Sequence, residues 1–163
     1  MITEASKHLQ QAKNKAARYC SVAERSPYQV LTKLQLYGLE FLEAKVVLKA
    51  LKEANFINEE RFVSSFVNDK FTYNKWGKIK ISLELRKHKI CAYQIEEGLN
   101  MIKKSDYESK ISELIDKKWY KLQGEEFFLI KKKKTCQFVI SKGFESHLVL
   151  AQFDKKVKNL LEL

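Results

Sequence analysis

The residues with the clearest capacity for chemistry are the cations of residues 76–90, WGKIKISLELRKHKI. This stretch carries five Lys and Arg side chains and a single acid, Glu84. Ammonium and guanidinium groups bind phosphates and carboxylates through charge-assisted hydrogen bonds. We therefore predict that the stretch contacts nucleic-acid phosphates or acidic side chains of a partner, through Lys78, Lys80, Arg86, Lys87 and Lys89.

The same residues have a second interpretation, in which they form an ordinary solvated helix face. Lys80 and Glu84 are four residues apart, which is the spacing of a surface ion pair on a helix. The sequence does not decide between these two roles for the lysines. Ile79 and Leu83 lie on the side of this helix opposite its core-facing side. We expect this apolar pair to pack on a neighbouring structural unit, and contact with a partner is the alternative.

Two further groups of residues are candidates for partner contact. Tyr73 and Trp76 stand in the turn before the basic helix, where aromatic rings can stack on the bases of a single strand. Lys131–Lys134 is a second basic cluster, but four consecutive helical residues point in four directions. A solvated turn and a phosphate contact are equally good interpretations of this cluster. Its candidate contact residues are Lys131, Lys133 and Lys134.

No arrangement of residues typical of catalysis stands out. His8, His88 and His147 are isolated, without cysteines or carboxylates at the spacing of metal ligands. The sequence has no glycine-rich phosphate loop and no Gly-x-Ser-x-Gly nucleophile elbow. We therefore expect a protein that is not an enzyme, with no catalytic residue, no metal and no cofactor.

The composition favours a basic, soluble, helical protein. The 163 residues carry a net charge of +11, and 45% of them are hydrophobic. Three cysteines far apart in sequence fit neither a disulfide framework nor a zinc site, and we expect them to be reduced. No stretch is apolar enough to cross a membrane, and residues 1–10 lack the apolar core of a secretory signal. We expect a cytoplasmic protein without membrane contact.

An internal repeat positions the basic helix. The segments VLTKLQLYGL (30–39), ISLELRKHKI (81–90) and TCQFVISKGF (135–144) align with periods of 51 and 54 residues. Such a period is typical of tandem repeats, here of three helices each. The fold prediction is all-α, with three tandem three-helix repeats forming an elongated, curved helical array. The repeats are predicted at 1–57, 58–104 and 105–163, with the central one basic. One alignment column holds Leu34, Leu85 and Val139, and the next apolar column holds Leu39, Ile90 and Phe144.

Charge is spread over all three predicted repeats. Lys and Arg outnumber Asp and Glu by 9 to 5 in residues 1–57, by 10 to 6 in 58–104 and by 12 to 9 in 105–163. An extended positive surface suits a long polyanion or an acidic groove better than one small anion. A basic surface without a binding role is the alternative.

Several helix ends can be located from the residue types. Ser26, Pro27 and Gln29 predict a capping box that begins a helix, and Gly38 predicts its end. Asn58 is the expected N-cap of the first helix of the second repeat. Ser105–Glu108 has the pattern of another capping box, which would open the third repeat.

The segments FINEERFVSSFVNDK (56–70) and WGKIKISLELRKHKI (76–90) together resemble the RecX family of bacterial regulators. That family carries an acidic-Arg-Phe motif followed by Gly-x-x-(basic)-Ile-x-x-Glu-Leu. The chain departs from the pattern with Ile79 at a usually basic position and Lys89 at a usual glycine. The resemblance extends from about residue 12 to the C-terminus. The matching residues are Arg61 and Phe62 in the first motif, and Gly77, Lys80, Ile81, Glu84 and Leu85 in the second.

The resemblance implies a non-enzymatic modulator of the RecA recombinase, and we expect the protein to be a monomer. Such a protein would bind the RecA–single-stranded DNA filament, and double-stranded DNA is a further candidate partner. It would inhibit ATP hydrolysis, strand exchange and coprotease activity in homologous recombination, DNA repair and the SOS response. The resemblance adds Arg61 to the candidate contact residues. Two other functions stay open: a general basic nucleic-acid-binding module that acts independently of RecA, and a scaffold for some other protein.

Overall fold

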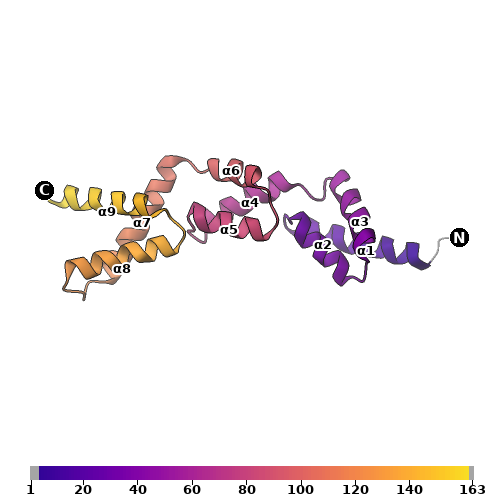
Figure 1. The fold of residues 1–163 in the computed structure, drawn as a ribbon, viewed down its shortest axis with the longest axis horizontal. Coiled ribbons are helices and arrows are strands. Elements are labelled where there is room, and N and C mark those ends of the chain that lie inside the picture. Colours follow the sequence, from indigo (N-terminus) through magenta and orange to yellow (C-terminus); the bar gives the residue numbers. More distant parts are fainter. Residues whose placement is uncertain (1–3, 162–163) are drawn as a thin grey trace. The chain divides into compact units, whose positions relative to one another are not determined.

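The computed structural model describes residues 4–161, and these form nine helices and no strand (Figure 1). The all-α prediction is confirmed. The nine helices have the following bounds: α1 Glu4–Val22, α2 Pro27–Leu36, α3 Phe41–Glu53, α4 Glu59–Thr72, α5 Lys78–Lys87, α6 Ala92–Asn100, α7 Lys104–Lys121, α8 Phe128–Ser141 and α9 Ser146–Leu161.

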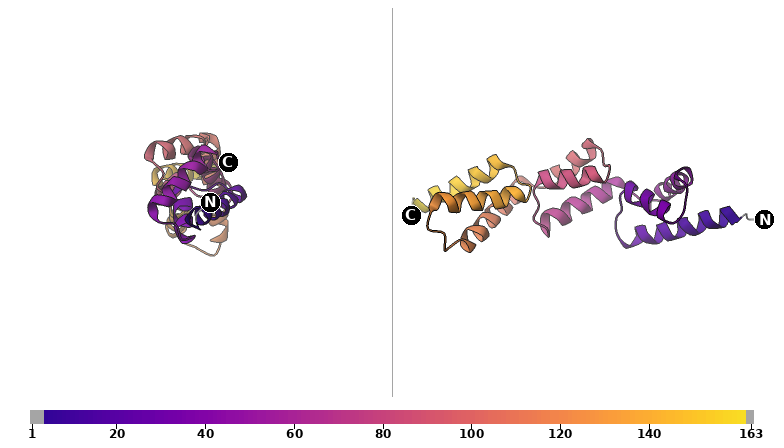
Figure 2. Two further views of the ribbon diagram at one scale, coloured as in Figure 1. Left: turned by 90° about the vertical axis from the view of Figure 1, so that its right-hand side faces the viewer. Right: turned by 60° about the horizontal axis from the view of Figure 1, so that its bottom comes forward.

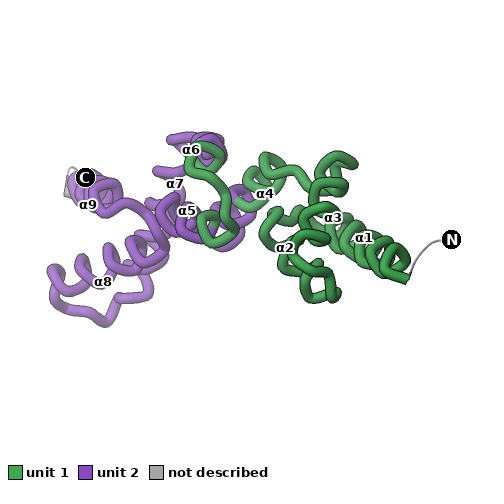
Figure 3. The backbone as a smooth tube through the Cα atoms, turned by 45° about the vertical axis from the view of Figure 1, so that its right-hand side comes forward, with its two compact units in different colours: residues 1–66, 85–96 green, residues 67–84, 97–163 purple. Residues whose placement is uncertain are grey.

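The chain divides into two compact units (Figure 3). Unit 1 consists of Met1–Phe66 and Leu85–Glu96, and unit 2 consists of Val67–Glu84 and Glu97–Leu163. The division passes through α4, α5 and α6, so each helix of the central triple contributes residues to both units. The three repeat boundaries given above stay a prediction.

Unit 1 is built around a core in which α1, α2 and α3 pack together (Figure 2). Alanines on α1 allow a close approach of the neighbouring helices, because Ala12 and Ala16 are buried with only a methyl group each. The remaining core side chains are branched aliphatics and one thiol. The buried cluster comprises Ala12, Ala16, Cys20, Val30, Leu34, Leu39, Ala44, Val47, Leu51 and Ile57.

Unit 2 has its own core, to which α7, α8 and α9 contribute (Figure 2). Aromatic side chains supply more of this core than of the core in unit 1, and Tyr107, Phe144 and Phe153 are all buried. The Tyr107 and Phe144 rings are 5.1 Å apart between centroids. The buried cluster comprises Tyr107, Ile111, Leu114, Ile115, Cys136, Val139, Phe144, Val149 and Phe153.

The aligned repeat segments end their helices in the same way. A residue with positive φ follows each helix: Gly38 at 87°, Lys89 at 60° and Gly143 at 93°. In each case its N–H donates to the carbonyl three residues earlier, at 2.8–2.9 Å. This is the hydrogen bond of a left-handed C-terminal cap. The two aligned apolar columns are buried in every segment, which confirms the alignment at Leu34, Leu85 and Val139 and at Leu39, Ile90 and Phe144.

Two of the predicted helix starts are confirmed and one is wrong. The Ser26 hydroxyl accepts from the Gln29 N–H at 3.1 Å and the Gln29 side chain accepts from the Ser26 N–H at 3.0 Å, which is a complete capping box. The Asn58 side chain accepts from the Arg61 N–H at 2.9 Å. The predicted box at Ser105–Glu108 does not form, because α7 begins earlier, with Lys103 as an N-cap that makes no side-chain hydrogen bond.

Candidate partner-binding surface around helix α5

The beginning of α5 is held by hydrogen bonds to α7 and to the turn between α8 and α9, all within unit 2. The Gly77 N–H donates to the Lys142 carbonyl at 2.9 Å, and the Ile79 N–H donates to the Gly143 carbonyl at 3.1 Å. The Lys78 N–H donates to the Tyr107 hydroxyl at 2.9 Å. Helix N-termini leave several N–H groups without an intrahelical partner. Here three of them have acceptors, so the orientation of α5 at this end is fixed.

Two glycines allow the backbone before α5 to lie directly against the backbone after α8. We call this close approach the Gly77–Gly143 contact. A Cβ added to Gly77 would lie 2.2 Å from the Gly143 carbonyl oxygen. A Cβ added to Gly143 would lie 2.3 Å from the Lys80 Cβ, and Gly143 also has positive φ. Neither position therefore has room for a side chain. The close approach explains why the residue that opens the basic helix is a glycine.

Tyr107 links this contact to a partly buried hydrogen bond with Glu145. Its hydroxyl donates to Glu145 Oε2 at 2.6 Å and accepts from the Lys78 N–H. Burial of the phenol and the hydrogen bond to Glu145 raise the pKa of Tyr107 above its ordinary value. The ring stacks on Phe71 and lies 5.2 Å from Lys78 Nζ. Tyr107 is thus a neutral hydrogen-bonding group that secures the start of α5.

Trp76, in the turn before α5, carries two lysines against its ring. Lys80 Nζ lies 4.5 Å from the ring centroid and Lys70 Nζ lies 5.0 Å from it. Both distances are within the range of cation–π attraction. Tyr73, in the same turn, is exposed. Sequence reasoning selected Trp76, Tyr73 and Lys80 but missed Lys70, whose only signal was a cation close in sequence to the aromatic turn.

The apolar pair on α5 does not pack as expected. Ile79 is 48% exposed and Leu83 is 53% exposed, so the prediction that they pack on a neighbouring repeat is wrong. The physical reason is that Ile81 and Leu85, on the opposite face, already supply the buried side of the helix. We define the Trp76 surface as Lys70, Tyr73, Trp76, Ile79, Lys80 and Leu83, all of unit 2.

The other candidate cations of α5 fall into two groups. Lys78 lies beside the Tyr107 ring and is half-buried. Arg86, Lys87 and Lys89 are exposed, and Lys89 Nζ lies 5.7 Å from the Tyr28 ring centroid within unit 1. The helical period of 3.6 residues places Arg86 on the same face of α5 as Ile79 and Leu83. Exposed cations and exposed apolar groups therefore share one face of this helix.

The turn before α5 also contains an ion pair that involves a residue with positive φ. Lys75 has a φ of 55°, and its ammonium donates to the Glu113 carboxylate on α7. Lys110 donates to the other oxygen of Glu113 at 3.1 Å. These hydrogen bonds, from Lys75 and then Lys110, lower the pKa of Glu113. The ammonium of Lys75 thus contacts an acid of the protein itself.

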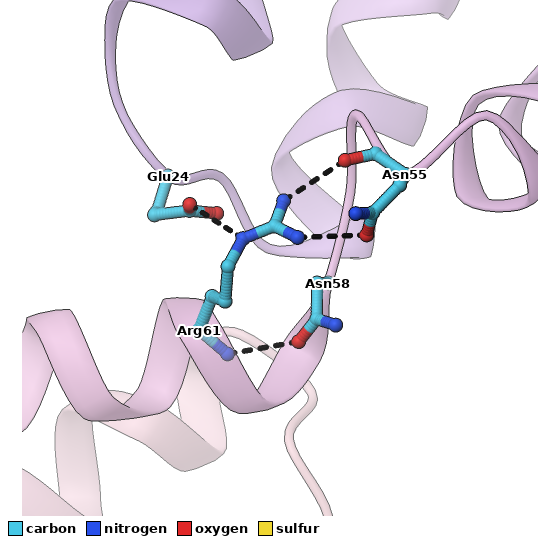
Figure 4. Close-up of polar contacts among 4 residues, drawn as sticks. All are labelled: Glu24, Asn55, Asn58 and Arg61. Carbon is cyan, nitrogen blue, oxygen red and sulfur yellow. Dashed lines mark hydrogen bonds and ion pairs between the residues drawn. The ribbon is translucent and has the colours of Figure 1, made fainter.

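Arg61 is engaged in a cluster within unit 1 (Figure 4). Its Nε donates to Glu24 Oε1 at 2.8 Å. Its two terminal nitrogens donate to the Asn55 side-chain oxygen at 2.7 Å and to the Asn55 carbonyl at 3.0 Å. We call Glu24, Asn55, Asn58 and Arg61 the Arg61 cluster. The guanidinium connects the segment that follows α1, the turn that follows α3, and α4.

The lysines of the second basic cluster go to separate partners. Lys131 Nζ lies 4.2 Å from the Trp119 ring centroid, and Lys132 binds Asp154 at 2.8 Å. Lys134 binds Glu125 at 2.5 Å, and this hydrogen bond lowers the pKa of Glu125. Lys133 is exposed. The structure does not bring Lys131, Lys133 and Lys134 together into one patch.

Residues 4–161 contain no arrangement typical of a metal site or of a membrane span. No group of three or more His, Cys, Asp or Glu in this described range is arranged to hold a metal ion. No helix within it is both long and apolar enough to cross a membrane. The three cysteines are free, and burial raises the pKa of the Cys20 and Cys136 thiols.

Comparison with known proteins places these features in a family. The family model of the second three-helix domain of RecX matches residues 58–99, which include the whole Trp76 surface. The regulatory protein RecX of Chlorobium phaeobacteroides is 30% identical over 145 residues, covering 86% of this chain and 89% of the relative. The chain belongs to the RecX family. Its relatives are named regulatory proteins.

Some members of the RecX family are longer than this chain. The regulatory protein RecX of Streptococcus agalactiae serotype V is 28% identical over 141 residues, and the match covers 86% of this chain but 54% of that protein. The chain therefore spans about half the length of this relative.

The crystal structure of RecX from Lactobacillus salivarius has the same fold, with a TM-score of 0.83 at 20% identity over 92% of this chain and 97% of that one.

Proposed function

We propose that this RecX-family protein binds the RecA–single-stranded DNA filament and inhibits its ATPase, strand-exchange and coprotease activities. The observation that carries the proposal is the Trp76 surface. It places two ammonium groups on an indole ring, with an exposed tyrosine and two exposed aliphatic side chains among the same residues. In this proposal the protein acts without catalysis, as a cytoplasmic monomer.

The chemistry of this surface fits a filament better than it fits free nucleic acid. A nucleoprotein filament offers phosphates, acidic side chains and apolar protein surface within one repeating groove. The lysines supply the electrostatic part of the affinity. Ile79 and Leu83 add apolar surface, and each Å² of it that is buried contributes about 25 cal/mol to binding. Contacts to successive protomers add through effective concentration, so each contact can be weak.

A general nucleic-acid-binding function is the second candidate, and the net charge of +11 supports it. Phosphate neutralisation would then supply the affinity, and binding would weaken steeply and uniformly with salt. Binding to the RecA filament would depend less steeply on salt, because its apolar contacts persist as the salt concentration rises. The two functions are therefore distinguished by comparing filament with free single-stranded DNA at two salt concentrations.

The variant Lys80→Glu/Lys87→Glu tests the proposal by filament binding in fluorescence anisotropy. Glutamate keeps the Cβ of residue 80, which lies against Gly143, so α5 should stay in place. The control Lys117→Glu/Lys121→Glu makes the same charge change at two exposed positions of α7. We expect the first variant to lose tenfold or more of its filament affinity, on the order of 1.4 kcal/mol, and the control to lose much less. Equal losses would show that only net charge matters, and would contradict the proposal.

A further inference from the structure

A pocket lies among α7, α8 and α9, and it shares no residue with the Trp76 surface. Its volume is about 250 Å³, and α7, α8 and α9 of unit 2 each contribute to its wall. An apolar protein cavity of about 150 Å³ is enough to bind benzene, so this pocket has room for an aromatic or branched side chain. The lining residues are Ile115, Asp116, Trp119, Phe128, Phe153, Lys156 and Val157.

The lining is apolar, and its two charged residues bind each other. Three aromatic rings meet edge to face, with centroids 5.7 Å apart for Trp119–Phe128 and 5.4 Å for Trp119–Phe153. The Lys156 ammonium is paired with the Asp116 carboxylate. Such a lining offers little to a polar occupant, because a buried donor or acceptor without a partner is costly. A nucleobase would leave its hydrogen-bonding edge unsatisfied here.

Exposed apolar groups and cations border the pocket. Phe127 and Leu129, on either side of the pocket residue Phe128, are exposed. Lys131 holds its ammonium against the Trp119 ring, and the next exposed cation along α8 is Lys133. The stretch 117–134 carries seven lysines and two glutamates. Lys132 and Lys134 of this stretch are paired with Asp154 and Glu125, whereas Lys131 brings its charge directly to the Trp119 ring of the pocket wall.

We propose that this pocket binds an apolar anchor side chain of an acidic peptide segment in a protein partner. The apolar lining selects the anchor, and the surrounding lysines select the acids that flank it. A second copy of this chain is disfavoured as the occupant, since two surfaces of the same positive charge repel each other. The pocket shares no residue with the Trp76 surface, so its binding of a peptide can be tested separately from the proposed function.

The experiment uses the full chain with Trp76 replaced by Phe, which leaves Trp119 as the single indole. The probes are anilinonaphthalene sulfonate, which joins an apolar ring system to an anion, and a synthetic glutamate-rich peptide with one central phenylalanine. We expect saturable dye binding with energy transfer from Trp119, and displacement of the dye by the peptide. The same peptide with serine in place of phenylalanine should displace the dye at least tenfold less well.

Two neighbouring residues supply a matched pair of variants. Phe128 lines the pocket and is 49% exposed, whereas Leu129 does not line it and is 77% exposed. Both can be replaced by serine with little expected loss of fold, which circular dichroism would check. We expect Phe128→Ser to weaken dye and peptide binding about tenfold and Leu129→Ser to weaken them less than twofold.

Several results would overturn the inference. Displacement by the serine peptide equal to that by the phenylalanine peptide would mean that only charge is recognised. Equal losses in both serine variants, together with binding to vesicles of phosphatidylglycerol, would assign the exposed apolar residues to a lipid surface. Concentration-dependent dimerisation that Phe128→Ser abolishes would assign the pocket to a second copy of the chain. Absence of dye binding would rule out the proposed binding site.

Discussion

The Arg61 cluster in unit 1 and the Gly77–Gly143 contact in unit 2 hold the beginnings of α4 and α5 in different ways. At α4, the Arg61 side chain is 39% exposed and its guanidinium donates to Glu24 and Asn55, so side chains make the connection. At α5, backbone N–H groups donate to backbone carbonyls across two glycines that leave no room for a Cβ. The first arrangement is polar and accessible to salt, whereas the second is steric and closed to solvent.

The start of α5 is more tightly constrained by its neighbours than the start of α4. Exposed charge pairs contribute little to stability, whereas forcing atoms into a packed contact is costly. The start of α5 should therefore tolerate substitution much less than the start of α4. Because α5 carries Ile79, Lys80 and Leu83, the steric contact in unit 2 is the one that sets the Trp76 surface.

The largest effect is expected from Gly77→Ala. The added methyl carbon would lie 2.2 Å from the Gly143 carbonyl oxygen, so the two backbones must separate and the hydrogen bonds of Gly77 and Ile79 must break. We expect a loss of unfolding free energy of about 3 kcal/mol or more in urea denaturation. Gly124→Ala is the control, because its Cβ would meet no atom within 4 Å. Equal stabilities of the two variants would refute the close contact.

A smaller loss is expected from Tyr107→Phe, which removes the hydroxyl between Lys78 and Glu145 and leaves both groups without this partner. The cost should be about 1–3 kcal/mol. Because the folded-state pKa of Tyr107 is raised, its contribution is complete below the unfolded pKa of about 10 and is lost as pH rises above that value. Stability measured from pH 8 to 11 should therefore fall less steeply in the variant than in the wild type.

The smallest effect is expected from Arg61→Met, which keeps much of the apolar stem and removes the guanidinium. Because the Arg61 side chain lies partly in water, the loss of unfolding free energy should be about 1 kcal/mol. This loss should shrink as salt screens the ion pair between Arg61 and Glu24. Both tryptophans lie in unit 2, whereas Arg61 lies in unit 1. The loss of stability in Arg61→Met should therefore appear in unfolding followed by circular dichroism, with little change in unfolding followed by tryptophan fluorescence. A loss as large as that of Gly77→Ala would reverse the comparison between the two regions.

Sequence reasoning located the elements better than it located their contacts. The capping box at Ser26 and the left-handed residues Gly38 and Gly143 were predictable, because residue type alone limits those backbone conformations. Lys103 as an N-cap was not predictable, since its side chain makes no capping hydrogen bond and a better pattern stands two residues later. Helix ends are thus predictable only where a side chain or a glycine sets them.

The candidate surface was predictable in its charge and not in its supports. Lys80 and Trp76 were selected because cations and aromatics stood together in sequence, and the structure brings them together. The supports of α5 come from Tyr107 and Gly143, far along the chain, and nothing in their local sequence identifies them. Ile79 and Leu83 were placed on the correct face, but only the structure shows that this face is exposed.

The measurement that tests the proposed function most directly is the single-stranded-DNA-dependent ATPase of RecA with increasing amounts of this RecX-family protein. Binding of the protein to the same DNA without RecA would be recorded at the same salt. We expect inhibition at concentrations well below those that cover the free DNA. No inhibition, or inhibition only where the free DNA is already covered, would contradict the proposal and leave a general nucleic-acid-binding protein.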